Sequence, residues 1–204
     1  LRVAPESQLF LIDLGEGNDR LGGSCLSQVY ELPGGAPADL VSAKKLQALF
    51  ELIQSANEQG YILAYHDRSD GGLFATLAEM SFAGHIGIDV VLPTANDTES
   101  LHAALFSEEL GAVVQVPADA TSDFQALLAH FGLDAMTTCV ASCNEVDQFR
   151  VIQKGATVFA SPRVELHRLW SEVSYRMQAE RDNPLTAMQQ YDAILDVDDP
   201  GLSP

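Results

Sequence analysis

At residues 64–73 the chain reads Ala64-Tyr65-His66-Asp67-Arg68-Ser69-Asp70-Gly71-Gly72-Leu73. An apolar run from Tyr61 to Tyr65 leads into this stretch, and an amphipathic run from Leu73 to Phe82 follows. The pattern predicts the C-terminal end of a β-strand followed by the N-terminus of a helix. Such a junction is a common ligand site in α/β domains, because free backbone N–H groups and the positive end of the helix dipole meet there.

The junction has two interpretations. In the first, Ser69 or Asp70 caps the following helix, and Gly71 and Gly72 only form the turn. In the second, Asp67 is a hard oxygen ligand for Mg²⁺ and the Ser69 hydroxyl contacts a nucleotide. The two glycines then place bare backbone beside a phosphate.

Three further groups of polar residues bear on a possible site. Gly22-Gly23-Ser24 either begins a helix with Ser24 as its N-cap or lets the backbone approach a ligand closely. Glu108-Glu109 precedes a predicted strand, where paired carboxylates usually form a solvated turn. His66 orients its neighbours at the strand end, since a role as general base needs a partner that the sequence does not identify.

The net charge of −18 over 204 residues restricts the partners of the chain. A field of that sign repels phosphate backbones and anionic membrane surfaces, which argues against nucleic acid and membranes. A phosphate ligand would need a divalent cation to bridge the like charges. The sequence also has neither an apolar run of roughly 20 residues nor the pattern of a signal peptide. It begins at Leu1 rather than at a methionine, so we expect part of a longer polypeptide.

The three cysteines, Cys25, Cys139 and Cys143, form neither an even disulfide set nor a metal-binding pattern. Cys139 and Cys143 lie in a predicted strand, and their even spacing predicts that both face the same side of it. We interpret the cysteines as buried, reduced thiols of a cytosolic protein.

Strand and helix patterns alternate along the chain and predict an α/β (α+β) domain with a mixed sheet in α-β-α layers. Asp39 and Gly60 are expected to begin and end one helix, and Ser161 and Pro162 to begin the last one. Strands are predicted over residues 8–14, 61–65, 86–92, 112–116, 137–142, 149–153 and 157–160, and helices over 39–60, 72–82, 101–106, 123–131 and from 162 onward.

The stretch 64–73 resembles the glycine-containing motif in the second half of the large, single-chain phosphoribosylformylglycinamidine synthase. Three other stretches agree with that family in the expected order and spacing, and together they span almost the whole chain. They are Arg20-Leu21-Gly22-Gly23-Ser24, Phe106-Ser107-Glu108-Glu109-Leu110-Gly111, and the helical segment from Leu169-Trp170-Ser171-Glu172 to Arg181-Asp182-Asn183-Pro184.

The resemblance implies a cytoplasmic ligase of de novo purine biosynthesis that uses ATP and glutamine. Such an enzyme converts formylglycinamide ribonucleotide to formylglycinamidine ribonucleotide. Its body resembles aminoimidazole ribonucleotide synthetase duplicated in tandem, followed by a glutaminase (glutamine amidotransferase) domain. ATP would activate the substrate amide oxygen as a phosphoryl imidate, and ammonia from the glutaminase would displace the phosphate.

Within that family the chain is similar to the C-terminal domain of the second synthetase half. Residues 1–19 would join it to the preceding domain, residues 20–190 would form the domain, and residues 191–204 would be an acidic linker toward the glutaminase. By the same comparison Asp67 matches a magnesium ligand and Ser69 a contact to ATP or ADP. Gly71 and Gly72 are expected to lie beside the phosphates of that nucleotide. No catalytic residue is expected in the fragment, which should be inactive alone and meet substrate and glutamine through other domains.

Two hypotheses from different classes follow. The domain either completes a Mg²⁺-nucleotide site of the ligase, or it is a structural domain that holds a fixed nucleotide or packs against neighbouring domains. Trp170 and Tyr175 are candidates for that packing surface. A third possibility from the same superfamily, a selenophosphate synthetase-like kinase, is opposed by the helical segment from Trp170 to Pro184.

Overall fold

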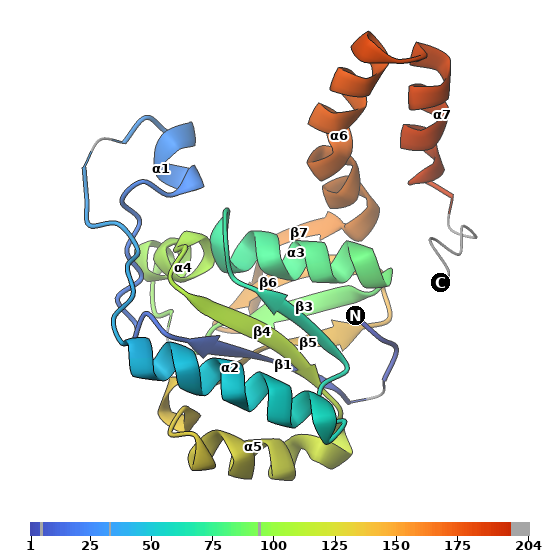
Figure 1. Ribbon diagram of the computed structural model, residues 1–204. Coiled ribbons are helices and arrows are strands. Elements are labelled where there is room, and N and C mark those ends of the chain that lie inside the picture. The colour runs from blue at the N-terminus through green and yellow to red at the C-terminus, as the bar shows by residue number, and fades with distance from the viewer. Residues whose placement is uncertain (5, 33, 94, 197–204) are drawn as a thin grey trace.

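A seven-stranded sheet forms the centre of the computed structural model, which describes residues 1–4, 6–32, 34–93 and 95–196 (Figure 1). The order across the sheet is β2-β4-β1-β5-β3-β6-β7. β3 and β6 run parallel and the other neighbours are antiparallel, which confirms the predicted mixed sheet. The strands are β1 (Gln8–Asp13), β2 (Ala64–Asp67), β3 (Gly87–Val91), β4 (Gly111–Val116), β5 (Thr137–Asn144), β6 (Gln148–Gln153) and β7 (Ala156–Pro162).

Helices cover both faces of the sheet and confirm the α-β-α layers. α3 and α4 lie on one face, and α2 and α5 lie on the other (Figure 1). The described helices are α1 (Cys25–Val29), α2 (Ala43–Glu58), α3 (Gly72–Gly84), α4 (Thr98–Phe106), α5 (Thr121–His130), α6 (Arg163–Arg181) and α7 (Pro184–Ala193), with short 3-10 helices η1 (Ala118–Ala120) and η2 (Asp134–Met136). Within the described ranges, none of the helices combines the length and the apolar character that crossing a membrane requires.

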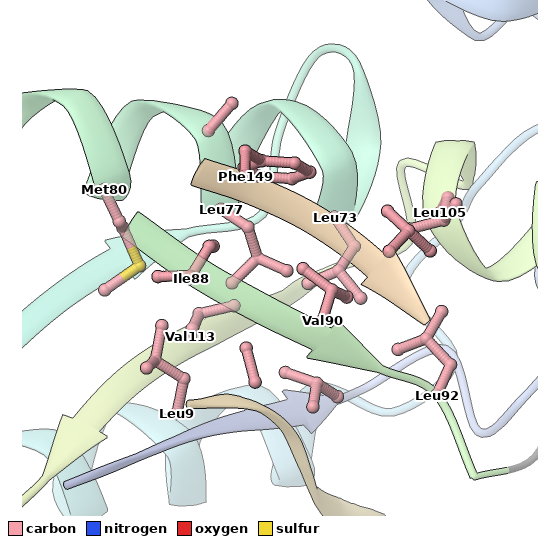
Figure 2. Packing of buried hydrophobic residues seen from close by; sticks show 14 of the residues in the cluster. Leu9, Leu73, Leu77, Met80, Ile88, Val90, Leu92, Leu105, Val113 and Phe149 are labelled. Atoms are coloured by element: carbon pink, nitrogen blue, oxygen red, sulfur yellow. The ribbon is translucent and has the colours of Figure 1, made fainter. Parts of the chain in front are cut away.

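Two hydrophobic clusters, one on each face of the sheet, hold the layers together. Figure 2 shows Leu73, Leu77 and Met80 of α3 directed toward Ile88 and Val90 of β3. The cluster on the opposite face joins β1 and β4 to α2 and α5. The burial of most of α3 against the sheet fixes the position of its N-terminus, where the junction of residues 64–73 lies.

The strand before the junction differs from its prediction. β2 begins at Ala64 rather than Tyr61 and continues through His66 and Asp67. Pairing with β4 sets these bounds, because Ala64 lies opposite Gln115 and Asp67 lies opposite Ala112. β2 is an edge strand of the sheet, so the junction lies at the side of the domain.

Two predicted helix starts are wrong. α2 is capped by Ser42, whose hydroxyl accepts the N–H of the third helical residue, and not by Asp39. Ser161 and Pro162 belong to β7, because the pairing with β6 continues until Pro162 lies opposite Gln148. α6 therefore begins one residue later and has no side-chain cap.

The C-terminal segment forms two helices, where the sequence indicated one. Asn183 caps α7 with its side-chain oxygen and Pro184 is the first helical residue, a typical helix start. α6 and α7 pack on each other, and α6 packs on α3, at the side of the domain (Figure 1). α7 continues to Ala193 and so includes the first residues of the predicted linker, whose residues 197–204 lie outside the described part.

The prediction that Cys139 and Cys143 share a face of β5 is wrong. In the pairing with β1, Leu9 lies opposite Ala141 and the next residue, Phe10, lies opposite Cys139, which leaves one extra residue in β5. Such a β-bulge reverses the alternation of side chains. Cys139 therefore packs in the cluster with α2 and α5, and Cys143 packs in the cluster with α3 and α4.

Gly72 allows α3 to approach the end of α4. It is buried at a φ of +67°, and a Cβ at this position would lie 2.7 Å from the carbonyl carbon of Phe106 and the carbonyl oxygen of Ser107. No real Cβ fits at that distance from backbone atoms. Packing between helices, rather than contact with a phosphate, therefore explains why this residue is a glycine.

We expect Gly72→Ala to destabilise the domain by about 3 kcal/mol, because the backbone of α4 must move in addition to the cost of a left-handed alanine. Gly132→Ala is a matched control at the same φ of +67° with open space around it, and should cost only about 1 kcal/mol. Urea unfolding of both variants measures the difference. Equal losses would contradict the packing role.

Candidate functional site

Three loops meet at one edge of the sheet. Asp13, the last residue of β1, lies opposite Gly111, and Asp67, the last residue of β2, lies opposite Ala112. The segments that follow β1 and β2 therefore lie beside the segment that precedes β4. Each of these segments carries charged residues, so this edge gathers the polar chemistry of the chain.

Arg68 is the buried centre of this edge, with a side chain that is 1% exposed. Its guanidinium donates to the Asp13 carboxylate at 2.5 Å and to the backbone carbonyls of Glu109, at 2.5 Å, and Leu110, at 3.2 Å. The Asp13 carboxylate also accepts the N–H groups of Gly15 and Gly17. Arg68 thus joins the ends of three strands.

Glu109 is completely buried and forms a bidentate ion pair with Arg20. Nε of Arg20 lies 2.5 Å from Oε1, and Nη2 lies 2.7 Å from Oε2. The stem of the Glu109 side chain packs against Gly15, where an added Cβ would lie 2.6 Å from Cβ and Cγ of Glu109. The interpretation of Glu108-Glu109 as a solvated turn is therefore wrong for Glu109.

Glu108 joins the two glycine-containing segments of the chain. Its Oε1 accepts the backbone N–H of Cys25, at the start of α1, and the N–H of Gly71, both at 2.8 Å. Ser24 is the N-cap of α1, as one interpretation of the sequence had it. A solvated turn is therefore wrong for Glu108 as well.

The junction at residues 68–72 is a glycine turn without a side-chain cap. Gly71 is the N-cap of α3 at a φ of +82°, so capping by Ser69 or Asp70 is wrong, while turn formation by the glycines is confirmed. The N–H of Gly71 goes to Glu108 and the N–H of Gly72 goes to the Ser69 carbonyl. Neither N–H group is free for a phosphate in this structure.

Asp67 fits a role as a single metal ligand. Its side chain is 67% exposed, and Nδ1 of His66 lies 3.9 Å from its Oδ1. Ser69 is also exposed. Across the described ranges, the one group of three possible ligands within reach of each other is Cys25, Asp70 and Glu108, which does not include Asp67.

The thiol in that group is a poor ligand. Burial, and then the hydrogen bond and charge of Glu108, raise the pKa of Cys25. The thiolate is the form that binds metals and attacks substrates, and it is scarce at neutral pH under these conditions.

His66 has the partner that the sequence did not identify. Its Nε2 lies 2.8 Å from the carboxylate of Glu79, and its Nδ1 lies 2.7 Å from the carbonyl oxygen of Asp67. Glu79 is the one charged residue of α3, an otherwise apolar and largely buried helix. That isolated charge was the available signal in the sequence.

A cavity of about 360 Å³ lies beside the buried ion pairs at this edge. Asp13, Asp19 and Arg68 line its polar side, whereas none of the four residues predicted to bind metal or nucleotide lines it. The pKa of Asp19 is raised by burial and by the neighbouring carboxylates, against the opposing effect of Arg68. Sequence analysis missed Arg68, Glu109 and Arg20 because long-range pairing gives them their role.

The fold and this edge define an α/β domain of the AIR synthase type. The family model described as "AIR synthase related protein, C-terminal domain" matches residues 7–138, more than half of the chain. The chain therefore belongs to this family. The matched range includes β1, the junction at residues 64–73 and the Glu108-Glu109 segment.

Solved structures share the fold at low sequence identity. Thermotoga maritima PurL complexed with ATP has a TM-score of 0.62 and 16% identity over 81% of this chain. T. maritima phosphoribosylformylglycinamidine synthase II gives 0.61 and 16% over 81%. This chain covers 26% of each of those chains. Escherichia coli HypE, a hydrogenase maturation protein, gives 0.54 and 19% identity, over 78% of this chain and 51% of HypE.

We expect Arg20→Met to destabilise the domain by about 3 kcal/mol, because the buried Glu109 carboxylate loses its charge partner. Lys45→Met is the matched control, since Lys45 pairs with Glu16 at 2.7 Å with both side chains about one third exposed, and should cost less than about 1 kcal/mol. Urea denaturation at neutral pH compares them. A loss for Arg20→Met no greater than that for Lys45→Met would show that the pair is not a major constraint.

Proposed function

We propose that the chain is a domain of an ATP- and glutamine-dependent ligase that converts formylglycinamide ribonucleotide to formylglycinamidine ribonucleotide. Its β2–α3 junction would contribute part of a Mg²⁺-nucleotide site. The observation that carries the proposal is an exposed Asp67 at the carboxyl end of an edge strand, within the part of the chain that matches the family. An oxygen ligand at the surface is available to a metal that other groups also bind.

The relatives of known structure support the proposal at the level of the ligand. T. maritima PurL has been solved with ATP, with ADP and with FGAR. HypE has a similar fold and a different role, so the sheet and helices alone do not select the reaction. The choice of reaction rests on the four motifs of the sequence.

Each residue of the junction has a proposed task. Asp67 would provide one carboxylate oxygen to Mg²⁺, and the exposed Ser69 hydroxyl would contact the nucleotide. Gly71 would let a nucleotide approach the turn, while Gly72 sets the turn by packing on α4. Bound Mg²⁺ would supply positive charge to phosphate oxygens. The other metal ligands would come from the nucleotide, from water and from other domains of the same polypeptide.

Contact with other domains also has a candidate surface. Leu169, Val173 and Met177 of α6 are each about two thirds exposed and lie on one side of the helix. Apolar side chains grouped in this way indicate a protein contact. Tyr175 stacks on Tyr191 of α7, so its ring packs within the domain.

The proposed reaction and the unpaired cysteines are both compatible with the cytoplasm.

Asp67→Asn in the full-length protein tests the site. We expect the bound magnesium and nucleotide of the purified protein to decrease, with an affinity for Mg²⁺-ADP at least about tenfold weaker, because one charged oxygen ligand is lost. Metal analysis, nucleotide chromatography and calorimetry measure these quantities. Asp119→Asn is the control, since Asp119 is exposed in η1, which follows the other end of β4.

The outcomes separate the two hypotheses. Unchanged nucleotide content together with normal glutamine-dependent synthesis would refute any role of Asp67 in the site. Lost synthesis with unchanged content would favour catalysis, and lost content with a lower melting temperature would favour a structural nucleotide. The isolated chain should form no product from ATP and glutamine, and product formation would overturn the assignment as one domain of a larger enzyme.

A further inference from the structure

Glu79 connects the candidate metal site to the C-terminal helices. One carboxylate oxygen lies 2.8 Å from Nε2 of His66, and the other accepts the indole N–H of Trp170 at 2.8 Å. His66 precedes Asp67 on β2, whereas Trp170 lies on α6, 91 residues from Glu79 in sequence. A single side chain of α3 therefore bridges an edge strand and a distant helix.

His66 is held at both ring nitrogens. Nε2 contacts the Glu79 carboxylate and Nδ1 contacts the carbonyl oxygen of Asp67 at 2.7 Å. Both partners are acceptors, so each contact is a hydrogen bond only while the ring nitrogen that faces it carries a hydrogen. The second contact is made to the backbone of Asp67 itself. The hydroxyl of Thr76 on α3 lies 3.5 Å from the same carbonyl oxygen. The residue that bears the candidate metal ligand is thus oriented from α3.

Trp170 extends this connection to α6. Its ring centroid lies 5.4 Å from that of Phe82 on α3, and its N–H is donated to Glu79 although the side chain is 59% exposed. An indole N–H bound to a carboxylate fixes the ring at a helix surface where it otherwise has freedom to rotate. The Glu79 carboxylate therefore contributes both to the packing of α6 on α3 and to the orientation of His66.

We propose that Glu79 is a positioning residue that holds His66, and through it Asp67, and couples this end of β2 to α6 through Trp170. The role of Asp67 in this inference rests on the proposed function, whereas the coupling of His66 to Trp170 does not. Neither His66 nor Glu79 needs to touch a nucleotide. A change at His66 should be detected at Trp170 through the Glu79 carboxylate that both side chains contact.

Trp170 is the only tryptophan of the chain, so tryptophan emission reports on the surroundings of this one ring. We expect His66→Ala in the 204-residue chain to shift the emission maximum in the same direction as Glu79→Ala. The double variant should show no shift beyond that of Glu79→Ala. His66→Gln should restore the emission, because its amide nitrogen can reach Glu79 in place of Nε2.

Tyr65→Ala is the control variant. Tyr65 is the neighbour of His66 on β2 but lines a groove with α2, on the opposite side of the strand. A general loosening of β2 would change the emission of this variant too, and that result would overturn the proposal. An emission from His66→Ala equal to that of the unaltered chain would also overturn it.

A second measurement tests the link to the metal site. In the full-length protein, Glu79→Ala should weaken Mg²⁺-ADP binding by about tenfold, as loss of an outer-shell partner does at other metal sites. Unchanged affinity would overturn the positioning of Asp67. If the unaltered protein binds no Mg²⁺-ADP, the proposed function fails, and the fluorescence of the His66 variants still decides whether Glu79 couples β2 to α6.

Discussion

The buried carboxylate of Glu109 is the constraint on which this edge of the domain depends. A charge without access to water is tolerated only when a partner and hydrogen bonds surround it. Arg20 supplies both, and in doing so fixes the loop after β1 against the segment before β4. The backbone carbonyl of Glu109 accepts a hydrogen bond from Arg68, whose guanidinium also donates to the Asp13 carboxylate. The glycine turn at residues 70–72 is thus held by a frame of largely buried ion pairs.

Local signals in the sequence were sufficient for most elements. The apolar periodicity of α3, the glycine turn before it and the β-branched run of β3 gave both the element types and the layered architecture. Where the prediction failed, a distant residue decided the outcome. β2 begins at Ala64 rather than at Tyr61 because its pairing with β4 begins with Ala64 opposite Gln115. Pro162 belongs to β7 rather than to a helix because it pairs with Gln148 of β6. Several residues near a helix start can act as its cap, and the contacts with the rest of the fold decide which of them does.

The candidate site was also predictable only in part, because some of its residues carry a local signal and others depend on distant partners. Asp67 and Ser69 are exposed side chains in a stretch with a recognisable motif, and the sequence alone draws attention to them. Arg20, Glu79 and Glu109 are ordinary charged residues by composition. Their roles come from side-chain partners distant in sequence, such as Glu109 for Arg20, 89 residues away, and Trp170 for Glu79, 91 residues away. The sequence allowed two roles for the glycines of the junction, turn formation and contact with a phosphate. For Gly72 the proximity of the Phe106 backbone explains the glycine by packing.

The β-bulge in β5 has a consequence for oxidation of the protein. By turning Cys139 and Cys143 to opposite faces, it places the width of the sheet between two thiols that the sequence spaces only four residues apart. Burial raises the pKa of both thiols, so each reacts slowly with oxidants. An oxidised sulfur on one face has no neighbouring thiol of this strand with which to condense. Four residues of an extended strand span about 13 Å, which is beyond the Cα separation of a disulfide, so the two thiols could not join even on one face. The bulge instead decides which buried cluster each thiol contacts.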